Sequence, residues 1–227
     1  MTDAIIFDKD GTLFDFRGTW GAWAERLLDE VAEGDSERHR TAARAIGFDS
    51  QSGFDPASVV IAGTPAEVGA VLTAATGWPA VELEILANRL AVETRQCEAP
   101  GLTRTLAHLS EHHVLGVVTN DGEAPARANL ESVQIAHFFA FIAGYDSGHG
   151  AKPDPGPLLA FSRATDTLPE RTLMVGDSRH DLAAGRAAGM TAVAVLTGMA
   201  EASELADLAD VVLPDISHLP EWISSRA

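Results

Sequence analysis

The sequence predicts an α/β fold, a doubly wound parallel sheet that carries an inserted all-helical cap. Short, nearly continuous apolar runs recur along the chain, and longer stretches with helical spacing lie between them. Such an alternation is typical of parallel βαβ units. It fails once, from about residue 15 to about residue 98, where helical patterns occur without a convincing strand. We therefore expect residues 1–14 and 99–227 to form the α/β core and residues 15–98 to form the cap.

Six apolar runs are interpreted as strands of the core sheet. They are apolar along nearly their whole length, as strands covered on both faces require. The predicted strands are residues 4–7, 114–118, 138–142, 173–175, 192–196 and 211–213. Helices are expected between them at about residues 102–111, 122–132, 155–164 and 180–188.

Three helices are expected in the cap. Apolar residues of the segment 20–31 recur at i, i+3, i+4, i+7, i+8 and i+11, which is one stripe of an amphipathic helix. Residues 66–76 and 80–95 show a similar pattern. Trp20 and Trp23 are expected in the core between cap helices, with a wall over a substrate as the alternative.

Composition and charge exclude several classes of protein. The 227 residues carry a formal net charge of −17, which argues against nucleic acid and anionic membranes as partners, because both attract clustered Lys and Arg. The single cysteine, Cys97, excludes an intramolecular disulfide framework. No apolar run reaches the ~18 residues of a membrane span, and the first residues do not resemble a signal peptide, so a cytoplasmic location is expected. The sequence predicts no oligomeric state.

Polar residues follow four of the predicted strands. They lie in the segments 8–13, 119–122, 152–155 and 176–181. Ligands of open α/β sheets bind outside the carboxyl ends of the strands. These four segments are therefore expected to share one site.

Aspartates dominate these strand ends. Asp8, Asp10, Asp177 and, as a further candidate, Asp181 would raise one another's pKa unless a cation lay among them. Mg²⁺ prefers carboxylate oxygens together with water and substrate phosphate. The cluster therefore predicts Mg²⁺ and an anionic substrate.

Three hydrogen-bond donors lie at the same strand ends. They are the Thr119 hydroxyl, the Asn120 amide and the ammonium of Lys152, one of only two lysines in the chain. Together with the carboxylates they predict a phosphate site between a metal and a lysine.

Asp8 and Asp10 are expected to act on one substrate atom. Residues i and i+2 of a strand point to the same face. One carboxylate can attack phosphorus while the other protonates the leaving oxygen. Gly11 permits the sharp turn that follows.

The four segments match, in order, the four motifs of the haloacid dehalogenase superfamily, and the chain is identified as resembling that family. The matching residues are Asp8-Lys9-Asp10-Gly11-Thr12-Leu13, Thr119-Asn120, Lys152-Pro153 and Gly176-Asp177-Ser178 with Asp181. The insertion resembles the family's small helical cap, and the core its Rossmann-like sheet. The third and fourth segments are most similar to phosphoglycolate-phosphatase-like members.

The resemblance implies specific roles. Asp8 would be the nucleophile that forms an aspartyl-phosphate, and Asp10 the general acid and then the base. Mg²⁺ would be held by Asp8, the backbone carbonyl of Asp10 and Asp177, with Ser178 and Asp181 orienting these ligands.

The resemblance also implies a substrate site. Thr119, Asn120 and Lys152 would bind the phosphoryl oxygens of a small phosphorylated metabolite, with phosphoglycolate the leading candidate. The segments 47–54 and 61–64 are expected either to face the site or to connect helices.

Alternative functions remain open at this point. A sugar-phosphate mutase of the β-phosphoglucomutase type keeps all four motifs, but such mutases have a histidine in the first cap helix, where this chain reads Arg17-Gly18-Thr19-Trp20. A non-catalytic phosphate-binding or regulatory protein would be expected to have lost a charged motif residue, and none is lost. Roles for Lys9, Arg17, Arg179 and His180 are left undecided.

Overall fold

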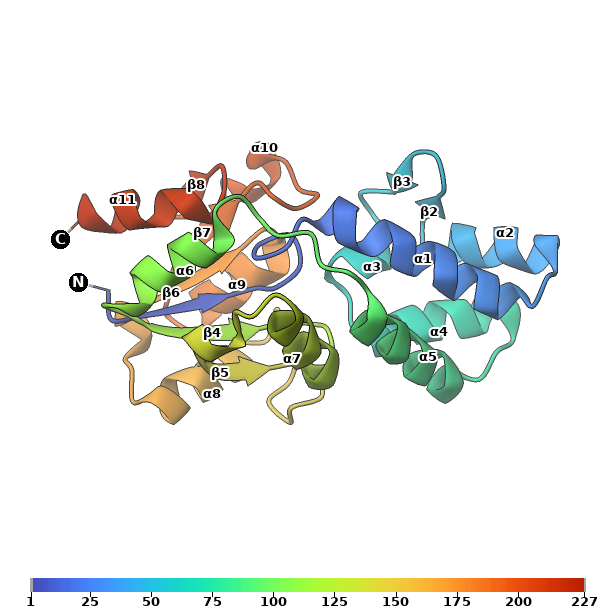
Figure 1. Cartoon of the computed structure of the whole chain (residues 1–227), viewed down its shortest axis with the longest axis horizontal. Helices are drawn as coiled ribbons and strands as arrows, with labels where there is room; N and C mark the ends of the chain where they lie inside the picture. The colour runs from blue at the N-terminus through green and yellow to red at the C-terminus, as the bar shows by residue number, and fades with distance from the viewer. Residues whose placement is uncertain (1, 227) are drawn as a thin grey trace.

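The core is a six-stranded parallel sheet with helices on both faces, seen at the left of the view in Figure 1. The computed structural model describes residues 2–226. The strands run in the order β5-β4-β1-β6-β7-β8, and every pair is parallel. Their bounds are β1 Ala4–Phe7, β4 Val114–Val118, β5 Phe139–Ala143, β6 Thr172–Gly176, β7 Thr191–Val195 and β8 Val211–Leu213. All six predicted strands are confirmed, with bounds that shift by at most one residue.

Alternation within the strands directs side chains to two apolar layers. Ile5 and Phe7 of β1 pack in one cluster with helix α6, Leu102–Ser110, and helix α7, Glu123–Ser132. Ala4 and Ile6 pack on the opposite face with α8, Gly156–Thr165, and α9, Arg179–Ala187. Two short helices not predicted from the sequence, α10 Ala202–Leu205 and α11 Leu219–Ser224, complete the core.

The segment between β1 and α6 forms a separate group of helices at the right of Figure 1. Its helices are α1 Phe16–Ala32, α2 Ser36–Ala45, α3 Val59–Ala62, α4 Pro65–Thr76 and α5 Ala80–Glu93. They enclose an apolar cluster of their own, which contains Trp20 and Trp23. The three predicted helices are therefore found as α1, α4 and α5.

Three cap elements were not predicted. A hairpin of two residues per strand, β2 Phe48–Asp49 and β3 Gly53–Phe54, interrupts the helices, so the segment is not entirely helical. Strands this short carry no readable alternation. Helix α2 buries only Ala42, so it has no apolar stripe, and α3 is a single turn.

Two adjacent chain segments join the cap to the core. The N–H of Asp15 donates to the carbonyl of Cys97 at 2.7 Å, and the N–H of Ala99 donates to the carbonyl of Leu13 at 2.9 Å. The inserted helices therefore begin and end close to each other, shortly after the carboxyl end of β1. Among residues 2–226, no helix has both the length and the apolar character needed to cross a bilayer.

Candidate active site

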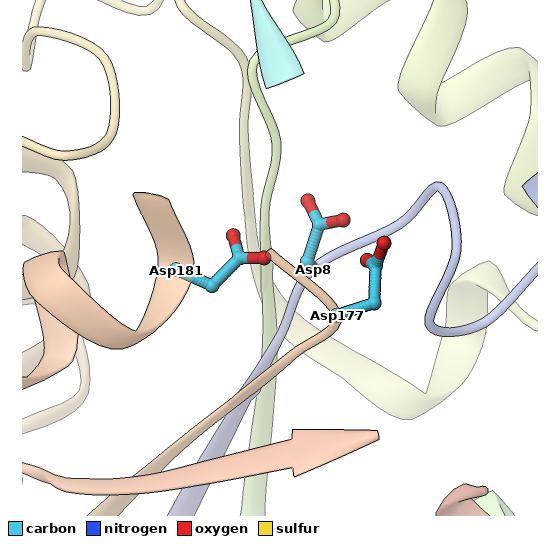
Figure 2. Close-up of side chains that lie close together, drawn as sticks. All are labelled: Asp8, Asp177 and Asp181. Carbon is cyan, nitrogen blue, oxygen red and sulfur yellow. The ribbon is translucent and has the colours of Figure 1, made fainter. Parts of the chain in front are cut away.

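Three buried aspartates meet at the carboxyl end of the sheet. Asp8 follows β1, Asp177 follows the neighbouring strand β6, and Asp181 lies in the first turn of α9 (Figure 2). One carboxylate oxygen of each lies within 4.8 Å of the others. The pairing of β1 with β6 brings Asp8 and Asp177 together although 169 positions separate them in the sequence.

Lys152 is the cation that the structure places among these carboxylates. Its Nζ lies 2.5 Å from Oδ1 of Asp8 and 2.6 Å from Oδ1 of Asp181, and the residue is 5% exposed. Burial alone would lower the pKa of Lys152, but the carboxylates of Asp181 and Asp8 outweigh it and raise the pKa. The lysine is therefore a permanent positive charge at this site.

One lysine does not neutralise three buried carboxylates. Burial raises the pKa of Asp8 to about 7, against the opposing charge of Lys152. Burial, with Asp181 and Asp8 nearby, holds the pKa of Asp177 well above its usual range. A divalent cation with a preference for oxygen ligands would stabilise the ionised forms of both groups. The donor set therefore fits Mg²⁺.

Two glycines make room for the Asp177 carboxylate. A Cβ atom at Gly11 would lie 2.3 Å from Oδ2 of Asp177, and one at Gly198 would lie 1.8 Å from the same oxygen. Thr12 Oγ1 donates to Oδ1 of Asp177 at 3.1 Å. The turn after β1 and the loop after β7 thus fix the position of this carboxylate.

Both oxygens of Asp181 are engaged by protein donors. Oδ1 pairs with Lys152, and Oδ2 accepts from the N–H of Ser178 at 3.0 Å and from its hydroxyl at 2.7 Å. This is the capping box that begins α9. Asp181 is therefore held on both sides, by Lys152 and by Ser178.

Asp10 lies beside a second buried lysine. Lys9 is 0% exposed, and its Nζ lies 3.0 Å from Oδ2 of Asp10, 3.0 Å from Oδ2 of Asp121 and 3.0 Å from Oδ1 of Asn129. Burial opposes the charge on Lys9, but the carboxylates of Asp10 and Asp121 outweigh it, so the pKa of Lys9 is raised. Lys9 is therefore a buried, paired cation and not a solvated surface lysine. No sequence pattern pointed to Asn129, and Asp121 was visible only as a neighbour of Thr119 and Asn120.

The Thr119 hydroxyl and the Asn120 side-chain amide differ in their hydrogen-bond partners. The Thr119 hydroxyl lines the cavity described below and accepts from the N–H of Asp121 at 3.0 Å. Both N–H groups of the Asn120 amide are used: Nδ2 donates to the carbonyls of Ala62, at 2.8 Å, and Lys152, at 2.9 Å. The expectation that this amide donates to a bound anion is therefore not met in this arrangement. Asn120 instead fixes the lysine loop and contacts the cap.

The residues left undecided by the sequence are now placed. Arg179 forms an exposed bidentate pair with Asp207, and exposed Arg17 donates to Sδ of Met199. Neither arginine lines the cavity beside the three buried aspartates. His180 does line the cavity, with Nδ1 3.3 Å from the carbonyl of Ala62.

A cavity of about 60 Å³ lies between the cap and the aspartate cluster. Its core side is polar and includes Asp8, Asp10, Asp177 and Lys152. Its cap side includes residues 60–63, so residues 61–63 of the segment 61–64 face the cavity. The segment 47–54 instead lines a separate groove. Trp20 and Trp23 lie both in the cap's apolar cluster and on the wall of this cavity.

Comparisons with known proteins identify the family and the fold. Residues 5–195 match the model of the haloacid dehalogenase-like hydrolase family. A protein of Mesorhizobium japonicum named phosphoglycolate phosphatase is 31% identical over 192 residues, which are 84% of this chain and 81% of that protein. A protein of Rhodospirillum rubrum with the same name is 35% identical over 125 residues, 55% of this chain and 52% of that protein. The chain thus matches about half the length, or less, of several curated relatives.

Solved structures with low sequence identity share the fold. A predicted phosphoglycolate phosphatase from Haemophilus somnus 129pt superposes with a TM-score of 0.76 at 19% identity, covering 98% of each chain. CbbY from Rhodobacter sphaeroides, determined in complex with phosphate, gives a TM-score of 0.71 at 20% identity, covering 96% of each chain. The family model matches most of this chain, and the buried acidic cluster lies at the carboxyl end of the parallel sheet. The chain therefore belongs to the haloacid dehalogenase-like hydrolases.

Proposed function

We propose that this protein is a Mg²⁺-dependent phosphomonoester hydrolase that acts on a small phosphorylated metabolite. The observation that carries the proposal is the convergence of Asp8, Asp177, Asp181 and Lys152 on one buried point at the floor of a small cavity. We propose further that residues 1–14 and 99–227 form the catalytic core and residues 15–98 the cap.

Asp8 is the nucleophile in this proposal. Its carboxylate attacks phosphorus, and the bond from phosphorus to the leaving alcohol oxygen breaks as an aspartyl-phosphate forms. Asp10 donates a proton to that oxygen. In the second step Asp10 takes a proton from water, the water oxygen attacks phosphorus, and release of phosphate regenerates Asp8.

Mg²⁺ would be held by Asp8, the backbone carbonyl of Asp10 and Asp177. When bound, it would supply positive charge that stabilises the ionised carboxylates and the phosphoryl oxygens. Ser178 and Asp181 would keep the neighbouring groups in place through the capping box.

Lys152 and Thr119 would bind phosphoryl oxygens directly. The Lys152 ammonium is already aligned with Asp8, so a phosphoryl group next to Asp8 would lie within its reach. Asn120 would contribute by holding the Lys152 backbone, through Nδ2 to its carbonyl and Oδ1 to its N–H, both at 2.9 Å.

The first cap helix favours hydrolysis over a mutase reaction. The residues of α1 that line the cavity are Phe16, Trp20 and Trp23, and none can transfer a proton to a sugar hydroxyl. Phosphoglycolate, to which the names of the relatives point, is the first substrate to test for this chain.

The test is phosphate release from a generic aryl phosphate and from phosphoglycolate, with Mg²⁺ and with EDTA. We expect metal-dependent turnover in the wild type and a loss of at least about a thousand-fold in kcat for Asp8→Asn. Asp207→Asn, on the exposed surface, is the matched control. Wild-type-like hydrolysis by Asp8→Asn would refute the assignment, and no metal-dependent release by the wild type from any small phosphomonoester would favour a non-catalytic phosphate-binding protein.

A further inference from the structure

The cap side of the catalytic cavity carries no charge. Within residues 2–226, the cap residues that line the cavity are all apolar or glycine, among them Phe16, Trp20, Trp23, Ile61 and Val68. The cap does contain arginines, but these lie elsewhere. Arg26 and Arg89, for example, form ion pairs with Glu93 and Glu30 on exposed helix surfaces.

The core side of the cavity offers little positive charge that is not already paired with its own aspartates. Five aspartates line it, and Lys152 pairs with two of them. Lys9, which is fully buried, does not line the cavity, and its ammonium is already paired with Asp10, Asp121 and Asn129. A second negative charge on the substrate, away from the phosphate, would therefore lie against an apolar wall without a counter-ion, which is unfavourable.

One polar group on the cap wall has no partner. Trp20 is 93% buried, and its indole Nε1 finds no acceptor among the described residues. Trp23, which makes an edge-to-face contact with Trp20, has its own N–H satisfied by the carbonyl of Ala87 at 3.1 Å. An indole N–H can only donate, and a buried donor is normally paired.

We infer that the leaving group of the phosphomonoester is a small alcohol without negative charge that carries one hydrogen-bond acceptor for the N–H of Trp20. This inference rests on the proposed phosphatase function and specifies its substrate class. The cavity volume of about 60 Å³ restricts the leaving group to a few heavy atoms while the cap is in this position. A site with a fixed donor discriminates against an analogue that lacks the acceptor.

Charge is tested with an isosteric pair of substrates. Phosphoglycolate and its primary amide differ in the charge of one end and hardly in size. We expect kcat/KM of the wild-type protein with Mg²⁺ to be at least about ten-fold higher for the amide. Equal values, or a preference for phosphoglycolate, would overturn the inference while leaving the phosphatase function intact. His180 is then the group to examine, because it is the only cavity-lining residue besides Lys152, within the described chain, that can carry a positive charge.

The acceptor is tested with a second isosteric pair. 2-Hydroxyethyl phosphate and n-propyl phosphate differ by one hydroxyl in place of a methyl group. We expect Trp20→Phe to lower the ratio of kcat/KM for the hydroxyl compound over the alkyl compound by about three- to ten-fold. Trp23→Phe is the matched control and should leave the ratio unchanged, because its N–H is already paired within the cap.

The outcomes separate the two claims. An unchanged ratio in Trp20→Phe, or an equal change in both tryptophan variants, would overturn the role of the Trp20 N–H. Absence of Mg²⁺-dependent phosphate release from all of these esters and from an aryl phosphate would overturn the proposed function and, with it, this inference. If Trp20→Phe does not fold, the comparison of phosphoglycolate with its amide still decides the charge of the leaving group, because it uses the wild-type protein.

Discussion

The ammonium of Lys9 lies 5.3 Å from the ring centroid of Trp20, so a buried cation of the core meets an aromatic ring of the cap. The same ammonium pairs with Asp10 and Asp121. Lys9 therefore links the position of the cap to the aspartate that we propose as general acid. The relationship gives Lys9 a positioning role, because the lysine acts through Asp10.

Lys9→Met is expected to destabilise the protein by about 3–5 kcal/mol, because it leaves the partly buried Asp10 carboxylate and the buried Asp121 carboxylate without their counter-ion. Urea denaturation measures the free energy of unfolding. The double variant Lys9→Met with Asp121→Asn should recover part of the lost free energy of unfolding, since it removes one of the two carboxylates left without a counter-ion. A free energy of unfolding equal to that of the wild type in the single variant would contradict the buried network.

The stabilisation of the protein by Mg²⁺ is expected to grow between pH 5 and pH 8. The pKa of Asp8 is about 7 in the folded metal-free protein, above its ordinary value of 3.8. A carboxyl whose pKa is raised by folding contributes stability below its unfolded pKa, and that contribution is lost as the pH rises through about 7. Mg²⁺ would bind the ionised form and offset the loss.

Thermal melting with and without saturating Mg²⁺ across this pH range checks the prediction. Asp177→Asn, which removes a proposed ligand, should give a small and nearly pH-independent shift. A metal-induced shift in Tm that is the same at pH 5 and pH 8 in the wild type would contradict the coupling between Asp8 ionisation and metal binding.

Gly198→Ala is expected to weaken metal binding more than it lowers the free energy of unfolding. Its Cβ would lie 1.8 Å from Oδ2 of Asp177, so the carboxylate or the loop must move. We expect the Mg²⁺ concentration for half-maximal activity to rise by at least about ten-fold, equivalent to 1.4 kcal/mol. Gly21→Ala in α1 is the matched control, because open space surrounds that position and alanine favours a helix by up to about 1 kcal/mol.

Glu84→Gln is expected to loosen the cap. The Tyr145 hydroxyl, after β5, donates to the Glu84 carboxylate on α5, and burial together with this bond raises the pKa of Tyr145 to about 12. Replacing the charged acceptor by an amide should weaken the bond and speed hydrogen exchange of the α5 amides by about two- to ten-fold. Glu82→Gln, exposed on the same helix, is the control, and identical exchange in the two variants would rule out the tie between cap and core.

Local patterns were enough to find most of the fold. The six core strands and the helices α1, α4 and α5 were all readable because each buries an apolar run or stripe that lies within a few residues of itself. Helix α2 and the hairpin β2–β3 were not readable, since neither has such a pattern. The four polar segments were also local features. Parallel pairing brings the three that directly follow β1, β4 and β6 to one edge of the sheet. The loop of Lys152, beyond the end of β5, is held there by its hydrogen bonds with Asn120.

By itself, the sequence determined the sheet, the position of the inserted helices and the set of acidic and donor residues at one edge. Only the tertiary structure decided which of these groups pair. Lys152 donates a hydrogen bond to Asp8, 144 residues away, and Lys9 donates one to Asn129, 120 residues away. The side-chain amide of Asn120 donates to the carbonyls of Ala62 and Lys152. Uncharged residues of the cap form one wall of the cavity. These contacts join residues far apart in the chain, and they depend on how the cap packs over the core, which no short stretch of sequence encodes.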